Sequence, residues 1–303
     1  MLKKFMSILL AGATIFALSA CSKKTSESAA DSSKLHVTVS FNAMRDLAEA
    51  IGKDKISVRT IIPDGTEPHD FELKPKDIAS LTEAKVFIYN GLGMETWASQ
   101  AVESADNKAL ISVEASKGVN AIKNTDESEI KDHGQYDPHA WLSISAAEKE
   151  AENIKNAFEK ADSSNKDFYE NNYKDFNSSL ESLLNEYKGK FASVSNKNFV
   201  TGHAAFAYLC RDFGLNQASV EDVFADGEPS AKKLKELTDF CKEKGIKTVF
   251  VEDMVSPKVS QTLANEVGAD VKQIATLESK DGDKTYIESM KNNLSEIYNS
   301  MSK

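Results

Sequence analysis

Hydrophobic positions along the chain fall either in short β-branched runs or in longer stretches with helical spacing. In the first part of the chain these two patterns alternate, which predicts strands separated by helices. The predicted strands span 35–40, 56–62, 86–89 and 109–113, and the predicted helices span 42–51, 74–83 and 94–103. Such alternation favours a largely parallel sheet with helices on both of its faces.

The middle of the chain has a different pattern. From 144 to 191 there is almost no strand signal, and aromatic residues and leucines recur at helical spacing. The alternation then returns near the carboxyl end. Strands are predicted at 198–201 and 248–252, and helices at 203–213, 230–244, 257–267 and 285–301.

Together these patterns predict an α/β protein with two small parallel-sheet lobes joined by one long rigid α-helix. We place the amino-terminal lobe at 35–162, the linking helix at 163–192 and the carboxyl-terminal lobe at 193–303. A connecting helix of about 25 residues would be about 40 Å long. It would be stiff, unlike the flexible chain segments that connect the two domains of a hinge-bending binding protein.

The amino-terminal residues have the pattern of an export signal. Two lysines precede the uncharged run 5–18, which is too short to span a bilayer comfortably. The sequence Leu18-Ser19-Ala20-Cys21 matches the cleavage box of bacterial lipoproteins. We therefore predict a signal peptide at 1–20, a lipidated Cys21, and a flexible tether over 21–34 that holds the protein outside the cytoplasmic membrane. The alternative is an ordinary secreted protein that is cleaved nearby.

Composition narrows the functional classes further. The chain has 303 residues, 41% of them hydrophobic and 28% charged, as in ordinary globular proteins. Its formal net charge is -10, so nucleic acid would be repelled from most of the surface. No segment after the leader is apolar for long enough to span a membrane.

Three of the five histidines lie where loops after strands are predicted. His69 and His139 each follow a proline in an acid-Pro-His arrangement, and His203 follows the predicted strand 198–201. Proline stiffens both loops, and a nearby acid could orient each ring. In open parallel sheets, ligands bind outside the carboxyl ends of the strands, so these side chains can meet in the cleft between two lobes. A single histidine in a loop is more often a surface residue, and sequence spacing alone does not prove that the three converge.

Several segments together resemble a known family. They are EPHDFE, DPHAW, TGHAAFAYLCRDFGL and GEPSAKKLKEL, and they accompany the lipoprotein box and the long central helix. In these segments the chain is similar to the zinc/manganese substrate-binding lipoproteins of bacterial ABC importers. The resemblance implies two α/β lobes bridged by one long helix, with a metal ion bound in the cleft between the lobes.

The resemblance also implies the metal ligands. It assigns His69 and His139 from the first lobe, His203 from the second, and a carboxylate from the loop before the final helix. Glu278 is the best candidate for that carboxylate, and Asp281 and Asp283 compete with it because the loop LESKDGDK departs from the commoner pattern.

Three imidazoles and one carboxylate suit four-coordinate zinc, whereas manganese prefers more oxygen ligands. In manganese-type relatives the position of His203 is typically an acid, so the resemblance favours zinc as bound cargo over manganese. It further implies that the protein delivers the metal to a membrane permease driven by a cytoplasmic ATPase. We expect the protein to act as a monomer. The loop 125–136 carries His133, which could bind zinc weakly as an auxiliary ligand.

Other functions remain as alternatives. A manganese- or iron-binding member of the same family is the first of them. A zinc hydrolase would need an open coordination position for an activated water, so the fourth ligand distinguishes it from a cargo protein. A surface adhesion protein is a further alternative. The chain lacks a G-x-S-x-G motif, and we expect no enzyme activity. Whether Cys210 and Cys241 form a disulfide is open.

Overall fold

Two parallel sheets organise the protein. The computed structural model describes residues 34–124, 130, 134–225, 229–253 and 256–302. The first sheet has the strand order β2-β1-β3-β4. Its strands are β1 (Leu35–Val39), β2 (Ile56–Thr60), β3 (Val86–Tyr89) and β4 (Ile111–Glu114), and helices α2 (Asn42–Gly52), α3 (Pro75–Glu83) and α4 (Ala98–Ala105) connect them. Its central strands β1 and β3 are apolar and mostly buried, as expected for strands that helices cover on both faces.

The second sheet repeats this order as β6-β5-β7-β8, again with every pairing parallel. Its strands are β5 (Asn198–Thr201), β6 (Asn216–Ser219), β7 (Thr248–Val251) and β8 (Asp270–Gln273), and its helices are α8 (Ala207–Phe213), α9 (Ala231–Lys244) and α10 (Pro257–Val267). Helix α9 shows how local sequence sets these bounds. Ser230 caps its first turn by accepting from the Lys233 N–H, and Gly245 ends it with a φ of 64°, which a residue without a Cβ adopts at little cost.

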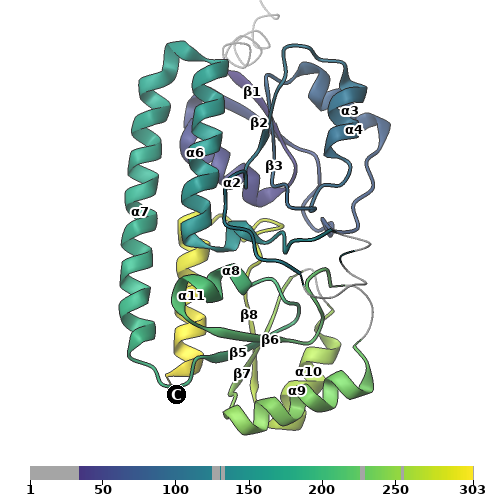
Figure 1. The fold of residues 1–303 in the computed structure, drawn as a ribbon, viewed down its shortest axis with the longest axis vertical. Helices are drawn as coiled ribbons and strands as arrows, with labels where there is room; N and C mark the ends of the chain where they lie inside the picture. The colour runs from purple at the N-terminus through teal and green to yellow at the C-terminus, as the bar shows by residue number, and fades with distance from the viewer. Residues whose placement is uncertain (1–33, 125–129, 131–133, 226–228, 254–255, 303) are drawn as a thin grey trace, which may run out of the picture. The chain divides into compact units, whose positions relative to one another are not determined.

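Long helices connect the two sheets. Helix α6 (Ile144–Ala161) leads through a short 3-10 turn (Ser163–Asn165) into α7 (Lys166–Ala192), and the last helix, α11 (Tyr286–Met301), packs against α7. Figure 1 shows α7 running beside both lobes. Its buried apolar residues form one stripe that joins a hydrophobic core shared by both sheets, and they are Tyr169, Phe176, Leu180, Leu183, Tyr187 and Phe191. The predicted fold class is therefore confirmed, and α7 is packed along its length.

Some predicted bounds were wrong. The helix predicted from His203 begins only at Ala207, because the carbonyl of His203 accepts hydrogen bonds from the side chains of Thr201 and Gln217. The helix predicted at 94–103 begins at Ala98, since the side chain of Glu95 accepts from the N–H groups of residues 90 and 91 and holds a turn there. The edge strands β6 and β8 were missed because their sequences, NQAS and DVKQ, lack an apolar run.

The pairing of the two cysteines, left open by the sequence, has an answer in the described residues. Cys210 and Cys241 are free thiols, and both are buried. They therefore act as small apolar side chains in two separate helices. No helix in the described ranges is long and apolar enough to cross a membrane.

Because the buried stripe on α7 is packed against the core, shortening one of its side chains in the middle of the helix should strongly destabilise the protein. Leu180 is fully buried, so Leu180→Ala should lower the free energy of unfolding by about 2 to 5 kcal/mol through lost burial and the cavity left behind. Ser178, on the exposed face of the same helix, is the matched control, and Ser178→Ala should change it by less than about 0.5 kcal/mol. Urea denaturation followed by circular dichroism measures both. Equal midpoints for Leu180→Ala and the unaltered protein would contradict a structural role for α7.

Candidate metal-binding site

Four side chains from four separate segments meet between the two sheets. His69 lies in the loop after β2, His139 follows β4, His203 follows β5, and Glu278 follows β8. One ligand atom from each lies within 4.8 Å of the others, and all four side chains are at most 2% exposed. The fold therefore brings together the residues that the sequence singled out, two from each lobe.

The spacing of the donor atoms fits one shared ion. The Nε2 atoms of His69 and His139 are 3.1 Å apart, and those of His139 and His203 are 3.4 Å apart. Glu278 Oε1 lies 3.6 Å from His139 Nε2 and 3.9 Å from His69 Nε2. Donor atoms arranged tetrahedrally around one zinc ion, at about 2.0 to 2.1 Å from it, lie about 3.3 Å from one another. The four distances given above, 3.1 to 3.9 Å, bracket this value.

A buried carboxylate holds the ring of His139. Oδ1 of Asp137 accepts from the main-chain N–H of His139 at 2.9 Å and lies 2.8 Å from its Nδ1, so Nε2 is left to face the other ligands. The segment itself is fixed from both lobes. Asn90 donates to the carbonyl of Pro138, and the hydroxyl of Tyr208 donates to the carbonyl of Asp137. The acid of the acid-Pro-His arrangement thus orients the ring, as the sequence suggested.

His69 is held differently. Its acid, Glu67, accepts from the main-chain N–H of His69 at 3.3 Å. The ring of His69 contacts that of Phe224 edge-to-face, with 5.2 Å between the centroids. The two acid-Pro-His segments therefore use their acids on different atoms, one on the ring and main chain and the other on the main chain.

Glu278 is presented by a bent segment after β8. Its Oε2 accepts from the hydroxyl of Thr276 at 2.7 Å, which leaves Oε1 facing the histidines. Leu277 has a φ of 62°, a left-handed conformation that is unfavourable for a residue with a side chain. Trp141 donates from Nε1 to the carbonyl of Thr276 at 2.7 Å, so the segments of His139 and Glu278 are directly linked.

Burial and mutual charge set the protonation of this cluster. Burial opposes the charged form of His139, but Asp137 and Glu278 outweigh it and raise the pKa of the ring to about 9. Burial by itself would raise the pKa of Glu278, yet the hydrogen bond with His139 and the charges of the histidines hold it well below the usual range. Burial lowers the pKa of His203 to about 4. His139 therefore carries charge at neutral pH and pairs with the carboxylate of Glu278, while His203 is neutral.

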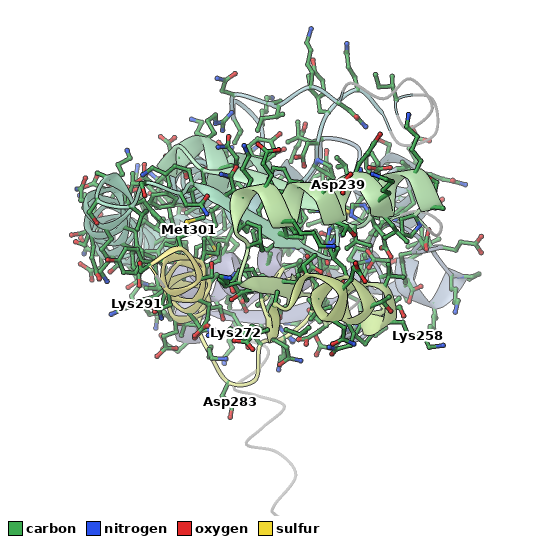
Figure 2. The ribbon with its side chains drawn as sticks, turned by 90° about the horizontal axis from the view of Figure 1, so that it is seen from below. Asp239, Lys258, Lys272, Asp283, Lys291 and Met301 are labelled. Atoms are coloured by element: carbon green, nitrogen blue, oxygen red, sulfur yellow. The ribbon has the colours of Figure 1, made fainter. Side chains whose placement is uncertain are left out.

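The two competing carboxylates lie elsewhere. Asp281 accepts from Lys284 Nζ at 2.7 Å and from the hydroxyl of Ser289 at 2.9 Å. Asp283 is exposed, and Figure 2 shows it at the outer end of its loop, pointing away from the protein. Both border a cavity of about 630 Å³ beside α2 and α7, which none of the three histidines lines. Two further predicted residues, Cys21 and His133, lie outside the described residues.

Known proteins have the same sequence pattern and fold. Residues 37–300 match the sequence profile of a family described as the periplasmic zinc-uptake complex component A. The chain belongs to this family. The high-affinity zinc uptake system protein ZnuA of Bacillus subtilis is 37% identical over 99% of this chain and 99% of its own length. The resemblance inferred from the motifs is therefore confirmed.

Two further relatives show the range of this zinc-uptake family. The manganese ABC transporter substrate-binding lipoprotein PsaA of Streptococcus anginosus is 31% identical over 100% of both chains. The laminin-binding protein Lmb of Streptococcus agalactiae is described as bifunctional, with adhesin and metal-transporting activity. Its structure superposes with a TM-score of 0.81 at 35% identity, covering 88% of this chain and 99% of that one.

Two residues beside the ligands were not predicted from the sequence. Thr276 orients Glu278, as described above. Glu252, directly after β7, accepts from the main-chain N–H of His203 at 3.2 Å. The rule that pointed to the histidines, polar side chains just beyond parallel strands, applies equally to Glu252 and could have found it.

Proposed function

We propose that this chain captures zinc outside the cytoplasmic membrane and delivers it to an ABC importer. The observation that carries the proposal is the buried cluster of three imidazole nitrogens and one carboxylate oxygen within 4.8 Å of one another. Unprotonated rings at such distances face each other with lone pairs, which is unfavourable unless a proton or a cation lies between them. A divalent ion at the centre would satisfy all four groups together.

The donor set favours zinc over manganese. Zinc commonly takes four ligands with imidazole nitrogen among them, whereas manganese prefers oxygen ligands and a larger coordination number. The third histidine, His203, decides between the two metals, since a carboxylate at its position would give the site two oxygen donors and make it better suited to manganese. The zinc uptake protein of Bacillus subtilis supports this choice, and the manganese lipoprotein PsaA keeps manganese as the alternative.

A bound ion in this site would be cargo. A catalytic zinc keeps one coordination position open for water, but here Glu278 supplies a fourth protein donor. The side chains are buried to 2% exposure or less, so a polymeric or bulky substrate would not reach the ion. We therefore assign the chain a transport role and no hydrolytic one.

The expected partners follow from the transport role. The loaded protein would dock on a permease driven by a cytoplasmic ATPase, as a monomer that a lipid on Cys21 keeps near the membrane. Lipoprotein relatives such as PsaA support the anchor. An adhesive role, described for Lmb, stays an alternative for this chain.

Metal titration tests the proposal directly. After removal of metal with a chelator, calorimetry should find one tight zinc site and much weaker manganese binding. His139→Ala should weaken zinc binding by at least about 100-fold, because it removes a ligand that Asp137 orients towards the site, while the circular dichroism spectrum stays unchanged. Tighter binding of manganese than zinc would contradict the zinc assignment, and binding of neither metal would contradict the proposed function.

The fourth ligand is tested by comparing three carboxylates. Glu278→Ala should weaken zinc binding strongly, since Oε1 faces the histidines. Asp281→Ala and Asp283→Ala should leave the dissociation constant within about twofold, because both side chains lie outside the cluster. Calorimetric titration of the three variants side by side measures this. A larger loss in either aspartate variant than in Glu278→Ala would reassign the ligand.

Acid should release the metal. Zinc binds only unprotonated rings, and His139 is protonated at pH 7 in the metal-free protein, because its pKa is about 9 despite burial. Zinc must displace that proton, so the dissociation constant should rise at least about tenfold for each pH unit lost between pH 7 and 6. His203, with its pKa near 4, contributes nothing in this window. Competition with a calibrated chelator measures the constant, and a value independent of pH would contradict a proton on His139 that zinc must displace.

A further inference from the structure

The outer side of the His203 ring is incompletely satisfied. Its Nε2 faces His139, but within the described part of the chain its Nδ1 has no hydrogen-bond partner, although the side chain is only 2% exposed. The nearest carboxylate oxygen is Oε1 of Glu252, 3.7 Å from Nδ1. A buried ring nitrogen without a partner is unfavourable, so this gap needs an explanation.

Glu252 has the same deficiency. Its side chain is fully buried, its Oε1 accepts the His203 main-chain N–H, and its Oε2 has no partner among the described residues. A ring N–H on a metal-bound histidine is the kind of donor that this carboxyl group lacks.

The fold places Glu252 firmly. It directly follows β7, and β7 pairs with β5, the strand that leads to His203. These two strands lie at the centre of the second sheet, where the strand order reverses. The arrangement parallels that of Asp137 and His139, in which a carboxylate oxygen contacts both the main-chain N–H and Nδ1 of one histidine. The difference is the distance to Nδ1, which is 2.8 Å in that pair and 3.7 Å here.

We propose that Glu252 is a positioning residue for His203, accepting its Nδ1–H when Nε2 binds the metal ion. The proposal rests on the function proposed above and deepens it. By accepting that proton, Glu252 fixes the tautomer whose Nε2 is free to bind, and it makes the ring a stronger donor. Each lobe then supplies one histidine that is backed by its own buried carboxylate.

The test compares two buried glutamates. Glu252→Gln keeps the size of the side chain and an oxygen that can accept the main-chain N–H, but it replaces the carboxylate beside Nδ1 with a neutral amide. It should weaken zinc binding by about 10- to 100-fold, as changes to residues behind metal ligands do. Glu150→Gln is the matched control, because Glu150 is fully buried on α6 and contacts none of the four ligands through a hydrogen bond. It should change the affinity by less than twofold.

A double-mutant cycle separates positioning from a general structural effect. In a His203→Ala background, Glu252→Gln should cost nothing further, because its effect passes through the missing ring. In the zinc-loaded unaltered protein, nitrogen NMR should show His203 protonated at Nδ1, and this signal should shift or vanish in Glu252→Gln. Wild-type affinity in Glu252→Gln, or an equal loss in the His203→Ala background, would overturn the proposal. Failure of the unaltered protein to bind zinc would instead overturn the proposed function.

Discussion

The close approach of three imidazole rings and one carboxylate is the constraint on which the rest of the structure depends. Nε2 atoms 3.1 and 3.4 Å apart, in a site closed to water, do not attract one another. The positive charge of His139 and the negative charge of Glu278 compensate for this in part. The backbone and neighbouring side chains such as Asp137 and Phe224 therefore hold the rings together.

The two sheets supply that rigidity by the same means. Each has the strand order 2-1-3-4, and each presents the carboxyl ends of its strands to the other. Since side chains after parallel strands share one edge, two facing sheets can place four ligands from distant segments within a few ångströms. Helix α7 and the core that it shares with both sheets hold the two sheets together, so the four ligand segments are fixed by packing.

Sequence reasoning reached the ligands but not everything that holds them. Position after predicted strands singled out His69, His139 and His203, and only the family resemblance added Glu278, because an acid in a polar loop carries no local signal. Glu252 was missed because the predicted strand 248–252 included it, whereas β7 ends at Val251 and leaves Glu252 just beyond the strand. The edge strand β8 was missed because pairing with β7, and not an apolar run, makes its residues a strand.

A transport protein must also release its ion. Hydrogen bonds between the two lobes, beside the site, limit how this can happen. Trp141 and Tyr208 each form a buried hydrogen bond from one lobe to the other, and Ser143 forms a third with Asp212. Swinging the lobes apart would break all three while exposing the shared core. Local movement costs less, and the segment before Glu278 already contains an unfavourable left-handed residue, Leu277. The strain lies next to one ligand only, so opening at Glu278 would leave the histidine cluster and the frame around it intact.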